Sequence, residues 1–285
     1  MGSTRNCEQD QVLDIYFGLS HFIMSCKRMW TMMASLLILS ALSAPAVAGA
    51  PTAPFPFASD PRPAFDGPRQ AVVVKTSEWK AQQGILQRYE RLPAKETWQV
   101  VGDAVPVVVW RNGLGWGVGL HPAATLDGPE KREGDGRSPA GVFRLSSAFG
   151  YAPAKEAAGI KLPYMEATPS LRCVDDAQSP HYNRIVDSSL IKPDWKSDEE
   201  MRRADDHYRL GIVVDHNTNP VVPGRGSCIF IHIWKGSDVG TAGCTAMSQE
   251  NMERLLRWLD PLANPILIQF PAGTYRELRT GWDLT

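Results

Sequence analysis

The sequence has no excess of charge of either sign and no basic tract. Its 285 residues include 30 Lys and Arg against 31 Asp and Glu, which gives a formal net charge of −1. Proteins that bind nucleic acids or anionic membrane surfaces usually carry clustered Lys and Arg. The composition therefore argues against a nucleic-acid-binding protein and against a polybasic membrane anchor.

The sequence also lacks the spacings that are typical of metal sites. None of its five cysteines forms a C-x-x-C pair or a His/Cys cluster with the spacing of zinc ligands. It shows no internal repeat either, so a solenoid or another repeat architecture is not expected. We predict one sizeable globular domain, or one domain with an appendage, without a bound metal.

The first informative segment that is present lies near the amino terminus. Lys27 and Arg28 precede an apolar run over residues 29–42, and an A-x-A site ends at Ala48. This pattern is typical of a secretory signal peptide, and the run is shorter than the roughly 20 residues of a membrane span. We predict a signal peptide over residues 1–48, with an over-extended start, and secretion to the periplasm or cell envelope. An uncleaved amino-terminal anchor is the alternative.

The mature chain is expected to begin with an arm and to continue as one β-rich domain. Residues 49–69 hold six prolines and read as an extended linker or surface arm. Residues 70–285 form the predicted domain. Its β-branched and apolar runs predict strands, which we place at residues 71–74, 85–89, 98–101, 105–110, 210–215, 227–234 and 265–270.

Two segments have helix signals. The capping box that begins at Ser197 predicts a helix over residues 198–208. Ser248 is placed to cap a second helix, in which apolar residues recur at helical spacing from Met252 onward. Strands without regular βαβ alternation favour a mainly β fold, namely a mixed, largely antiparallel sheet or sandwich that curls around a core with a few helices.

Cys244 is the candidate nucleophile. It lies in a loop between a buried strand and the helix that follows Ser248, where backbone N–H groups favour a thiolate and a developing oxyanion. The preceding Gly243 permits a sharp turn and close approach of a substrate. A buried, inert cysteine is the alternative interpretation.

His232 is the candidate base for this cysteine. It lies twelve positions before Cys244 near the end of a predicted strand, flanked by Ile231 and Ile233. A neighbouring imidazole has a suitable pKa to accept the thiol proton. A core histidine with satisfied hydrogen bonds is the alternative.

The other two cysteines of the mature chain have a structural interpretation. Cys228 lies four residues from His232 on the same strand, roughly 13 Å away at about 3.3 Å per residue, which is beyond hydrogen-bonding reach. Because an exported chain with three cysteines can form one disulfide, we hypothesise that Cys228 pairs with Cys173.

Two segments resemble the L,D-transpeptidase (YkuD-like) catalytic domain family. EGDGRSPAGVF at 133–143 is similar to the family's Gly…Thr-Pro-x-Gly-x-Phe segment, with Ser138 in place of Thr. GSCIFIHIW…GTAGC at 226–244 is similar to the family's His strand and its Ser-x-Gly-Cys loop. The resemblance covers about residues 70–271 and implies the family's β fold.

The resemblance also implies roles for individual residues. Cys244 matches the family nucleophile, His232 its general base, Gly243 the glycine beside the nucleophile and Thr241 the Ser/Thr of the loop. In the family the imidazole is held by a backbone carbonyl, and no metal or organic cofactor is needed. Ala242 and Ala246 depart from the family, which often has His and Arg or Asn there, and the gap from His to Cys is shorter.

Further residues are candidates for substrate binding. They are Thr241 and Thr245 beside the cysteine, Trp234 on the histidine strand, and His216 and Tyr182 on loops or strand ends. For the last two, turn or core-edge positions are the alternative.

The implied activity is a peptidoglycan L,D-transpeptidase that forms 3–3 cross-links between stem peptides through a cysteine thioester. One alternative uses the same cysteine and histidine to hydrolyse an envelope amide, as an L,D-carboxypeptidase or a hydrolase of peptidoglycan–protein links. A second alternative is a non-catalytic cell-wall-binding module. The sequence does not indicate an oligomeric state.

Overall fold

A computed structural model describes residues 67–92, 97–122, 127–282 and 284–285. The expected signal peptide, 1–48, lies outside the described residues, as do all but the last three residues of the expected arm, 49–69. The chain divides into two compact units, and every described residue belongs to the second, 50–285. In this described part, no helix has both the length and the apolar character that a membrane span requires.

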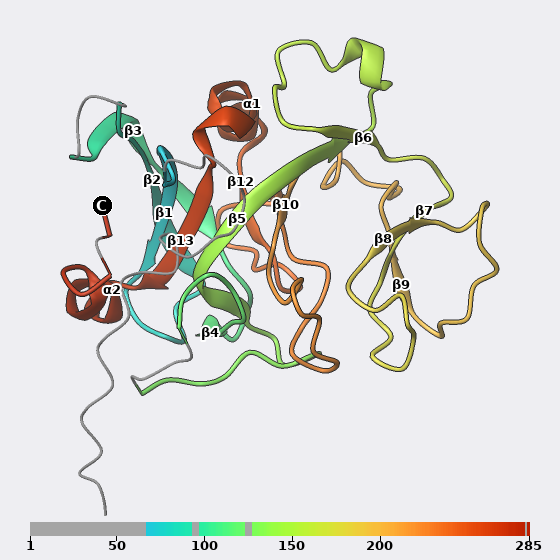
Figure 1. The fold of residues 1–285 in the computed structure, drawn as a ribbon, viewed down its shortest axis with the longest axis horizontal. Coiled ribbons are helices and arrows are strands. Elements are labelled where there is room, and N and C mark those ends of the chain that lie inside the picture. The colour runs from blue at the N-terminus through green and yellow to red at the C-terminus, as the bar shows by residue number, and fades with distance from the viewer. Residues whose placement is uncertain (1–66, 93–96, 123–126, 283) are drawn as a thin grey trace, which may run out of the picture. The chain divides into compact units, whose positions relative to one another are not determined.

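Ten strands form one mixed, largely antiparallel sheet (Figure 1). The strands are β1 (Gln70–Thr76), β2 (Gln83–Glu90), β3 (Gln99–Val108), β4 (Leu114–Trp116), β5 (Ser138–Gly150), β6 (Tyr164–Glu166), β10 (Leu210–Val214), β11 (Phe230–Ile233), β12 (Thr245–Met247) and β13 (Ile266–Pro271). Their order is β10-β11-β12-β3-β2-β1-β13-β5-β4, and β6 pairs with β5. The predicted mainly β fold is confirmed.

The long strand β5 closes this sheet on itself. Its residues 141–144 pair with β13, whereas residues 145–150 pair with β10 at the other end of the strand order. The sheet is therefore a ring of eight strands from β10 to β5, with β4 and β6 attached to β5. This closure explains the curled sheet that the strand pattern predicted.

The ring buries both faces of its central strands. Along β1, Val72 and Val74 pack into one hydrophobic cluster, while Ala71 and Val73 pack into another. Alternate residues of a strand point to opposite faces, so a continuous apolar run fits a strand that is covered on both sides.

A helix covers each of these two faces. Helix α1 (Gln249–Trp258) contributes Met252, Leu255 and Leu256 to the first cluster, and α2 (Ala272–Leu278) contributes Tyr275 and Leu278 to the second.

Helix α1 begins where the sequence predicts. The hydroxyl of Ser248 accepts a hydrogen bond from the Asn251 N–H, which satisfies one of the free donors of the first turn. Helix α2 was not predicted. Two short 3-10 helices, η2 (Ala154–Glu156) and η3 (Pro261–Ala263), complete the helical elements of the described residues.

A second, three-stranded sheet accompanies the ring (Figure 1). It consists of β7 (Leu171–Val174) between β8 (Ile185–Asp187) and β9 (Asp198–Glu200). A disulfide between Cys173 on β7 and Cys228, just before β11, ties the small sheet to the large one. Cys173 and Cys228 are the cysteine pair hypothesised from the sequence.

The predicted helix over residues 198–208 is wrong. Residues 198–200 form strand β9, which pairs with β7, and turns and bends follow up to residue 209. The capping box supplies only a start signal, and between the buried Met201 and Tyr208 the same helical face would present Ala204 and Asp205 instead of large apolar side chains. Pairing with β7 and packing of these two side chains therefore prevail over the local signal.

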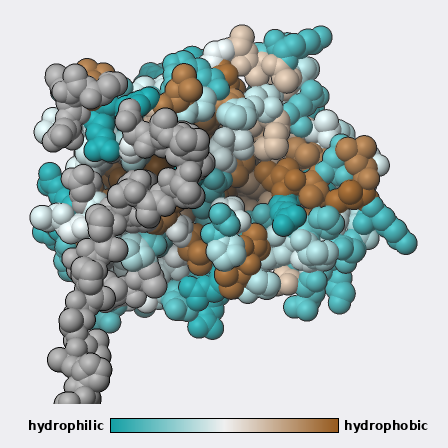
Figure 2. Space-filling model, viewed as in Figure 1, coloured by the Kyte–Doolittle hydropathy of each residue, from teal (hydrophilic) through white to brown (hydrophobic). Residues whose placement is uncertain are grey.

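The outer face of the molecule in this view is mixed in character. Figure 2 shows hydrophobic residues between hydrophilic ones on the same side as Figure 1. The most exposed large apolar side chains, Leu190 and Leu262, belong to segments far apart in the sequence. Single exposed apolar residues of this kind are common on proteins and need no functional explanation.

Candidate active site

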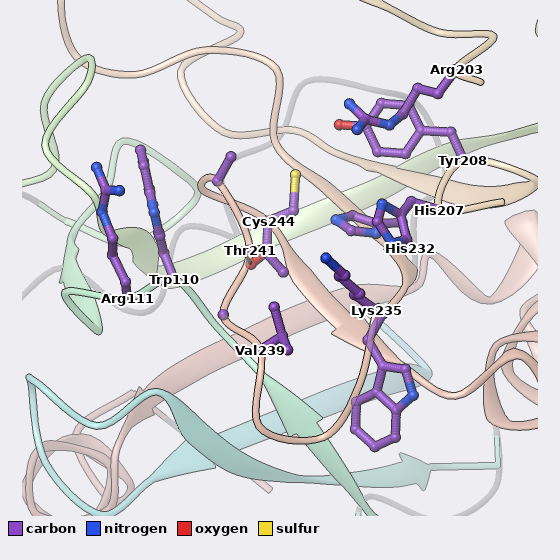
Figure 3. Close-up of a pocket in the computed structure, with 13 residues that line it drawn as sticks. Trp110, Arg111, Arg203, His207, Tyr208, His232, Lys235, Val239, Thr241 and Cys244 are labelled. Carbon is purple, nitrogen blue, oxygen red and sulfur yellow. Dashed lines mark hydrogen bonds between the residues drawn. The ribbon is translucent and has the colours of Figure 1, made fainter. Parts of the chain in front are cut away.

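A pocket of about 510 Å³ opens beside strands β11 and β12 (Figure 3). Three parts of the chain line it: the segment after β3 with Trp110 and Arg111, the loop before β10 with residues 203–208, and the β11–β12 connection. Both candidate catalytic residues, Cys244 and His232, are among the lining residues.

Cys244 is held at the end of the β11–β12 connection, one residue before β12. It is the free cysteine of the described residues, and 3% of its surface is exposed. The preceding Gly243 has φ 145°, a backbone conformation that other residues rarely adopt. The Cys244 carbonyl accepts hydrogen bonds from the hydroxyls of Thr241 at 2.6 Å and Ser138 at 2.9 Å. Two hydroxyls from different segments thus hold the backbone of the candidate nucleophile.

The Cys244 sulfur contacts the start of β11. The Phe230 N–H donates to the sulfur at 3.3 Å, and the thiol lies 3.6 Å from the Cys228 carbonyl, to which it donates. Burial raises the pKa of the Cys244 thiol well above its ordinary value. The resting residue is therefore a neutral thiol with one donor already directed at its sulfur.

His232 lies on β11, the strand next to the cysteine. Its register partner in the parallel β11–β12 pair is Ala246, two residues beyond Cys244. The imidazole Nδ1 lies 2.8 Å from the Ile233 carbonyl, so Nδ1 carries the proton and donates it there. This leaves Nε2 as the unprotonated nitrogen. Burial lowers the pKa of His232 to about 4, so the ring is neutral at neutral pH.

The thiol and the imidazole share one wall of the pocket (Figure 3). In the resting structure the sulfur's hydrogen bonds go to the backbone of β11 rather than to the ring. Catalytic hydrogen bonds are often long or misaligned without substrate, and this geometry is consistent with such a pair.

Tyr208 lines the pocket beside His232. Its buried ring packs edge-on against His232, with ring centroids 5.2 Å apart, and its hydroxyl donates to the Glu199 carboxylate at 2.6 Å. Burial raises the pKa of Glu199 to about 7. Neither Tyr208 nor Glu199 is predicted as a site residue from the sequence. Their pairing depends on β9 lying beside the loop before β10, and no local motif signals it.

The charged groups that line the pocket are cationic. Arg111, Arg203 and Lys235 line it, and no Asp or Glu does. Arg203 forms two hydrogen bonds of 2.9 Å with Asp205, which lowers the pKa of that carboxyl to about 2. Among the described residues, Arg111 and Lys235 have no acidic partner within ion-pair distance. An anionic group that enters the pocket would therefore find two unpaired cations.

Two of the predicted substrate-binding residues, Thr241 and Trp234, line this pocket. The other three are buried elsewhere with internal partners. Thr245 donates to the Gln269 side chain at 2.7 Å, and His216 lies between the Val118 N–H and the Arg225 carbonyl. Tyr182 donates to Glu133 and accepts from the Gly226 N–H. The structure thus does not place Thr245, His216 or Tyr182 on the lining of the pocket.

The described residues do not contain a cluster of three or more His, Cys, Asp or Glu side chains that could hold a metal ion. The groups that the pocket offers to chemistry are the thiol, the imidazole, the Tyr208 hydroxyl and the cations.

Comparisons with known proteins identify a family. Residues 127–268 match the model of the YkuD family, the L,D-transpeptidase catalytic domain, and this span includes Ser138, His232 and Cys244. No curated protein matches the sequence. Among solved structures, the helical cell shape determining protein Pgp2 from Campylobacter jejuni is similar, with a TM-score of 0.34 and 15% identity.

That similarity covers 73% of this chain and 49% of Pgp2, so the chain spans about half the length of that protein. The family match covers most of the described residues, from before β5 to the middle of β13. The chain belongs to the YkuD family of L,D-transpeptidase catalytic domains.

Proposed function

We propose that this protein is a peptidoglycan L,D-transpeptidase of the cell envelope, with Cys244 as nucleophile and His232 as general base. The observation that carries the proposal is the presence of a free thiol and a neutral imidazole with an available Nε2 in one pocket. The family to which the chain belongs supplies the reaction class. The expected signal peptide agrees with a substrate outside the cytoplasm.

The first chemical step forms a thioester. The Cys244 thiol transfers its proton to Nε2 of His232 while the sulfur attacks the carbonyl carbon at the L-centre of diaminopimelate in a stem peptide. The tetrahedral intermediate collapses when the imidazolium returns the proton to the departing D-Ala amine. Because burial opposes both a thiolate and an imidazolium, this ion pair is a minor form of the resting site.

The second step releases the acyl group. A side-chain amine of another stem attacks the thioester, its proton passes to His232, and the thiol is restored as the 3–3 cross-link forms. The Ile233 carbonyl keeps the ring in the tautomer that both steps need. The backbone N–H of Cys244 is the proposed donor to the oxyanion, on the loop that Thr241 and Ser138 hold.

The charge of the pocket suits this substrate. Stem peptides carry free carboxylates near the scissile bond, and Arg111 and Lys235 line the pocket without acidic partners among the described residues. We assign these two side chains to binding the substrate carboxylates. They lie on separate segments, one after β3 and one after β11, so that they approach a ligand from two sides.

Incubation of the mature protein with a disaccharide-tetrapeptide, followed by mass spectrometry of the products, tests the proposal. A cross-linked dimer with loss of D-Ala is the expected product. A tripeptide without a dimer would replace the transpeptidase with the carboxypeptidase alternative. No product and no mass adduct on Cys244 would contradict an enzyme and favour the wall-binding alternative.

The control for this experiment is Cys244→Ala, which removes the sulfur and keeps the loop's backbone hydrogen bonds. Its folded state is verified by the thermal unfolding midpoint before the assay. Any product that persists in this variant does not come from the proposed nucleophile.

A further inference from the structure

Tyr208 lies between a carboxyl group and the reactive sulfur. Its hydroxyl donates to Glu199 at 2.6 Å, and its side chain packs in one buried cluster with Cys244 and lines the same pocket. Figure 3 shows the hydroxyl end of Tyr208 directed toward the side where the thiol points. Glu199 itself does not line the pocket. Any influence of this carboxyl on the sulfur through hydrogen bonds must therefore pass through Tyr208.

The Tyr208 hydroxyl has one proton, so it can donate to only one of its two neighbours at a time. When Glu199 is ionised, the proton points to the carboxylate, as in the hydrogen bond of 2.6 Å. When Glu199 is protonated, the carboxylic acid becomes the donor to the tyrosine oxygen. The tyrosine proton is then free to turn toward Cys244, where it would stabilise a thiolate.

The surroundings of Glu199 place this exchange near neutral pH. Burial is the main cause that raises the pKa of Glu199 to about 7, and the charges of Asp175 and Glu133 act in the same direction. Tyr208, as a donor, and the Arg203 guanidinium act in the opposite direction. Both protonation states are therefore populated under ordinary conditions.

The small sheet fixes the position of Glu199. Strand β9 pairs Glu199 with Cys173, and the Cys173–Cys228 disulfide ties that strand pair to the segment before β11. The aromatic ring of Tyr208 is held by edge-on contacts with Phe149, Phe230 and His232 at centroid distances of 5.5, 5.6 and 5.2 Å. The hydroxyl can thus exchange partners by rotation of its O–H bond alone.

We infer that Tyr208 is a further catalytic residue, which donates a hydrogen bond to the Cys244 thiolate, and that Glu199 is a positioning residue whose protonation directs this donor to the sulfur. The inference rests on the proposed role of Cys244 as nucleophile. Only hydrogen bonds change in this exchange. The thiol proton still goes to His232, and the Tyr208 hydroxyl keeps its proton.

The rate of alkylation of Cys244 by iodoacetamide, measured on the folded, non-reduced mature protein from about pH 6 to about pH 9, tests the inference. Tyr208→Phe removes only the hydroxyl and should slow alkylation near pH 6, where Glu199 is largely protonated, by about tenfold or more, the effect of one hydrogen bond to a charged group. Glu199→Gln holds a neutral donor beside the tyrosine oxygen at every pH. The alkylation rate of Glu199→Gln, divided by that of the wild type, should therefore rise by about tenfold from pH 6 to pH 9, because Glu199 of the wild type ionises over this range.

Matched substitutions separate this effect from general charge and packing. Glu200→Gln removes the same charge from the next residue of β9, where the carboxylate pairs with Arg172 at 2.9 Å and is exposed. Tyr164→Phe removes a hydroxyl that donates to the Ala152 carbonyl away from the pocket. Neither control should change the pH profile of alkylation.

A double substitution isolates the role of the hydroxyl. If Glu199 acts through Tyr208, the pH-dependent gain of Glu199→Gln should be largely lost when Phe replaces Tyr208. A full gain in the double variant, an unchanged rate in Tyr208→Phe, or parallel pH profiles for Glu199→Gln and wild type would each overturn the inference. The failure of the proposed function looks different, because Cys244 would then be unreactive in the wild type as well.

Discussion

The hydroxyl of Ser138 donates a hydrogen bond of 2.9 Å to the carbonyl of Cys244, 106 residues further along the chain. The same hydroxyl accepts from the Trp110 N–H at 3.0 Å. Ser138 begins β5, so the strand that closes the ring also braces the loop of the proposed nucleophile and the Trp110 side of the pocket. The two segments that resemble the YkuD family therefore meet at one side chain.

Replacement of Ser138 by Ala should destabilise the protein and displace the proposed nucleophile, Cys244. The variant leaves the Trp110 N–H and the buried Cys244 carbonyl with fewer hydrogen-bond partners. This loss should lower the free energy of unfolding by about 1–3 kcal/mol. Urea unfolding gives the change in free energy, and alkylation of Cys244 gives the change at the site. The control is Ser146→Ala, also on β5, which removes an exposed hydroxyl that donates to the Asp215 carboxylate. Equal stability of the two variants would contradict a bracing role for Ser138.

Replacement of Cys244 by Ser should abolish nearly all turnover while the fold persists. A hydroxyl is ionised far less readily than a thiol, and His232 lies in a site where burial already opposes charge separation. The acyl-enzyme adduct expected in the wild type by intact-protein mass spectrometry should be missing. Turnover of the Ser variant within about tenfold of wild type would refute a cysteine-dependent mechanism.

The disulfide predicts the number of free thiols. The unfolded, non-reduced mature protein should titrate one thiol, Cys244, and three after reduction. With a separation of 55 residues, the cross-link stabilises the fold by about 4 kcal/mol in the chain-entropy model. Reduction should lower the unfolding midpoint accordingly. Three thiols before reduction would show that Cys173 and Cys228 do not pair.

Stability should decrease as the pH falls below about 6.5. Burial lowers the folded-state pKa of His232 and His121 to about 4 and that of His216 to about 3, all below the unfolded value. The unfolded chain therefore binds more protons across this window, so acid favours unfolding. His232 alone accounts for roughly 3 kcal/mol between pH 6.5 and pH 4. His232→Asn should show a smaller change in unfolding free energy over this range, and an identical change would argue that His232 is not buried in neutral form.

The pocket cations should affect binding more than chemistry. Arg111→Gln or Lys235→Gln should raise KM for a tetrapeptide substrate by about tenfold, in line with the loss of one charge-assisted hydrogen bond. The value of kcat should change less, because neither residue is assigned a role at the reacting atoms. Amidation of the substrate carboxylates should mimic the substitutions. Lys161→Gln, at an exposed ion pair with Asp260, is the charge-matched control.

Several parts of the fold could be predicted because their signals are local. Ser248 caps α1 through its own hydroxyl, and the apolar runs at β1 and β13 mark strands that are buried on both faces. The expected strand at 227–234 is shorter in the structure and starts at Phe230. Its first residues turn at Cys228, whose φ of 54° is incompatible with a strand. The turn directs this cysteine to its disulfide partner.

The remaining parts depend on contacts between distant segments. Strands β7, β8 and β9 have three or four residues each, too few for a periodic signal. Glu199 and Tyr208 are nine residues apart, in a segment whose capping box suggested a helix. The ring closure requires β5 to bend from β13 to β10, which no residue pattern in its sequence specifies. Tertiary pairing therefore determines the features that local propensity misses.

The closed ring also limits how a peptide can dock. Each of its eight strands already has a neighbour on both sides, so the ring has no unpaired edge strand beside Cys244 for a ligand to extend. A bound stem peptide must then be recognised through side chains and loop backbone at the mouth of the pocket instead of through a ladder of main-chain hydrogen bonds. Ligand preference in this protein is accordingly a property of its loops, which can diverge while the ring stays the same.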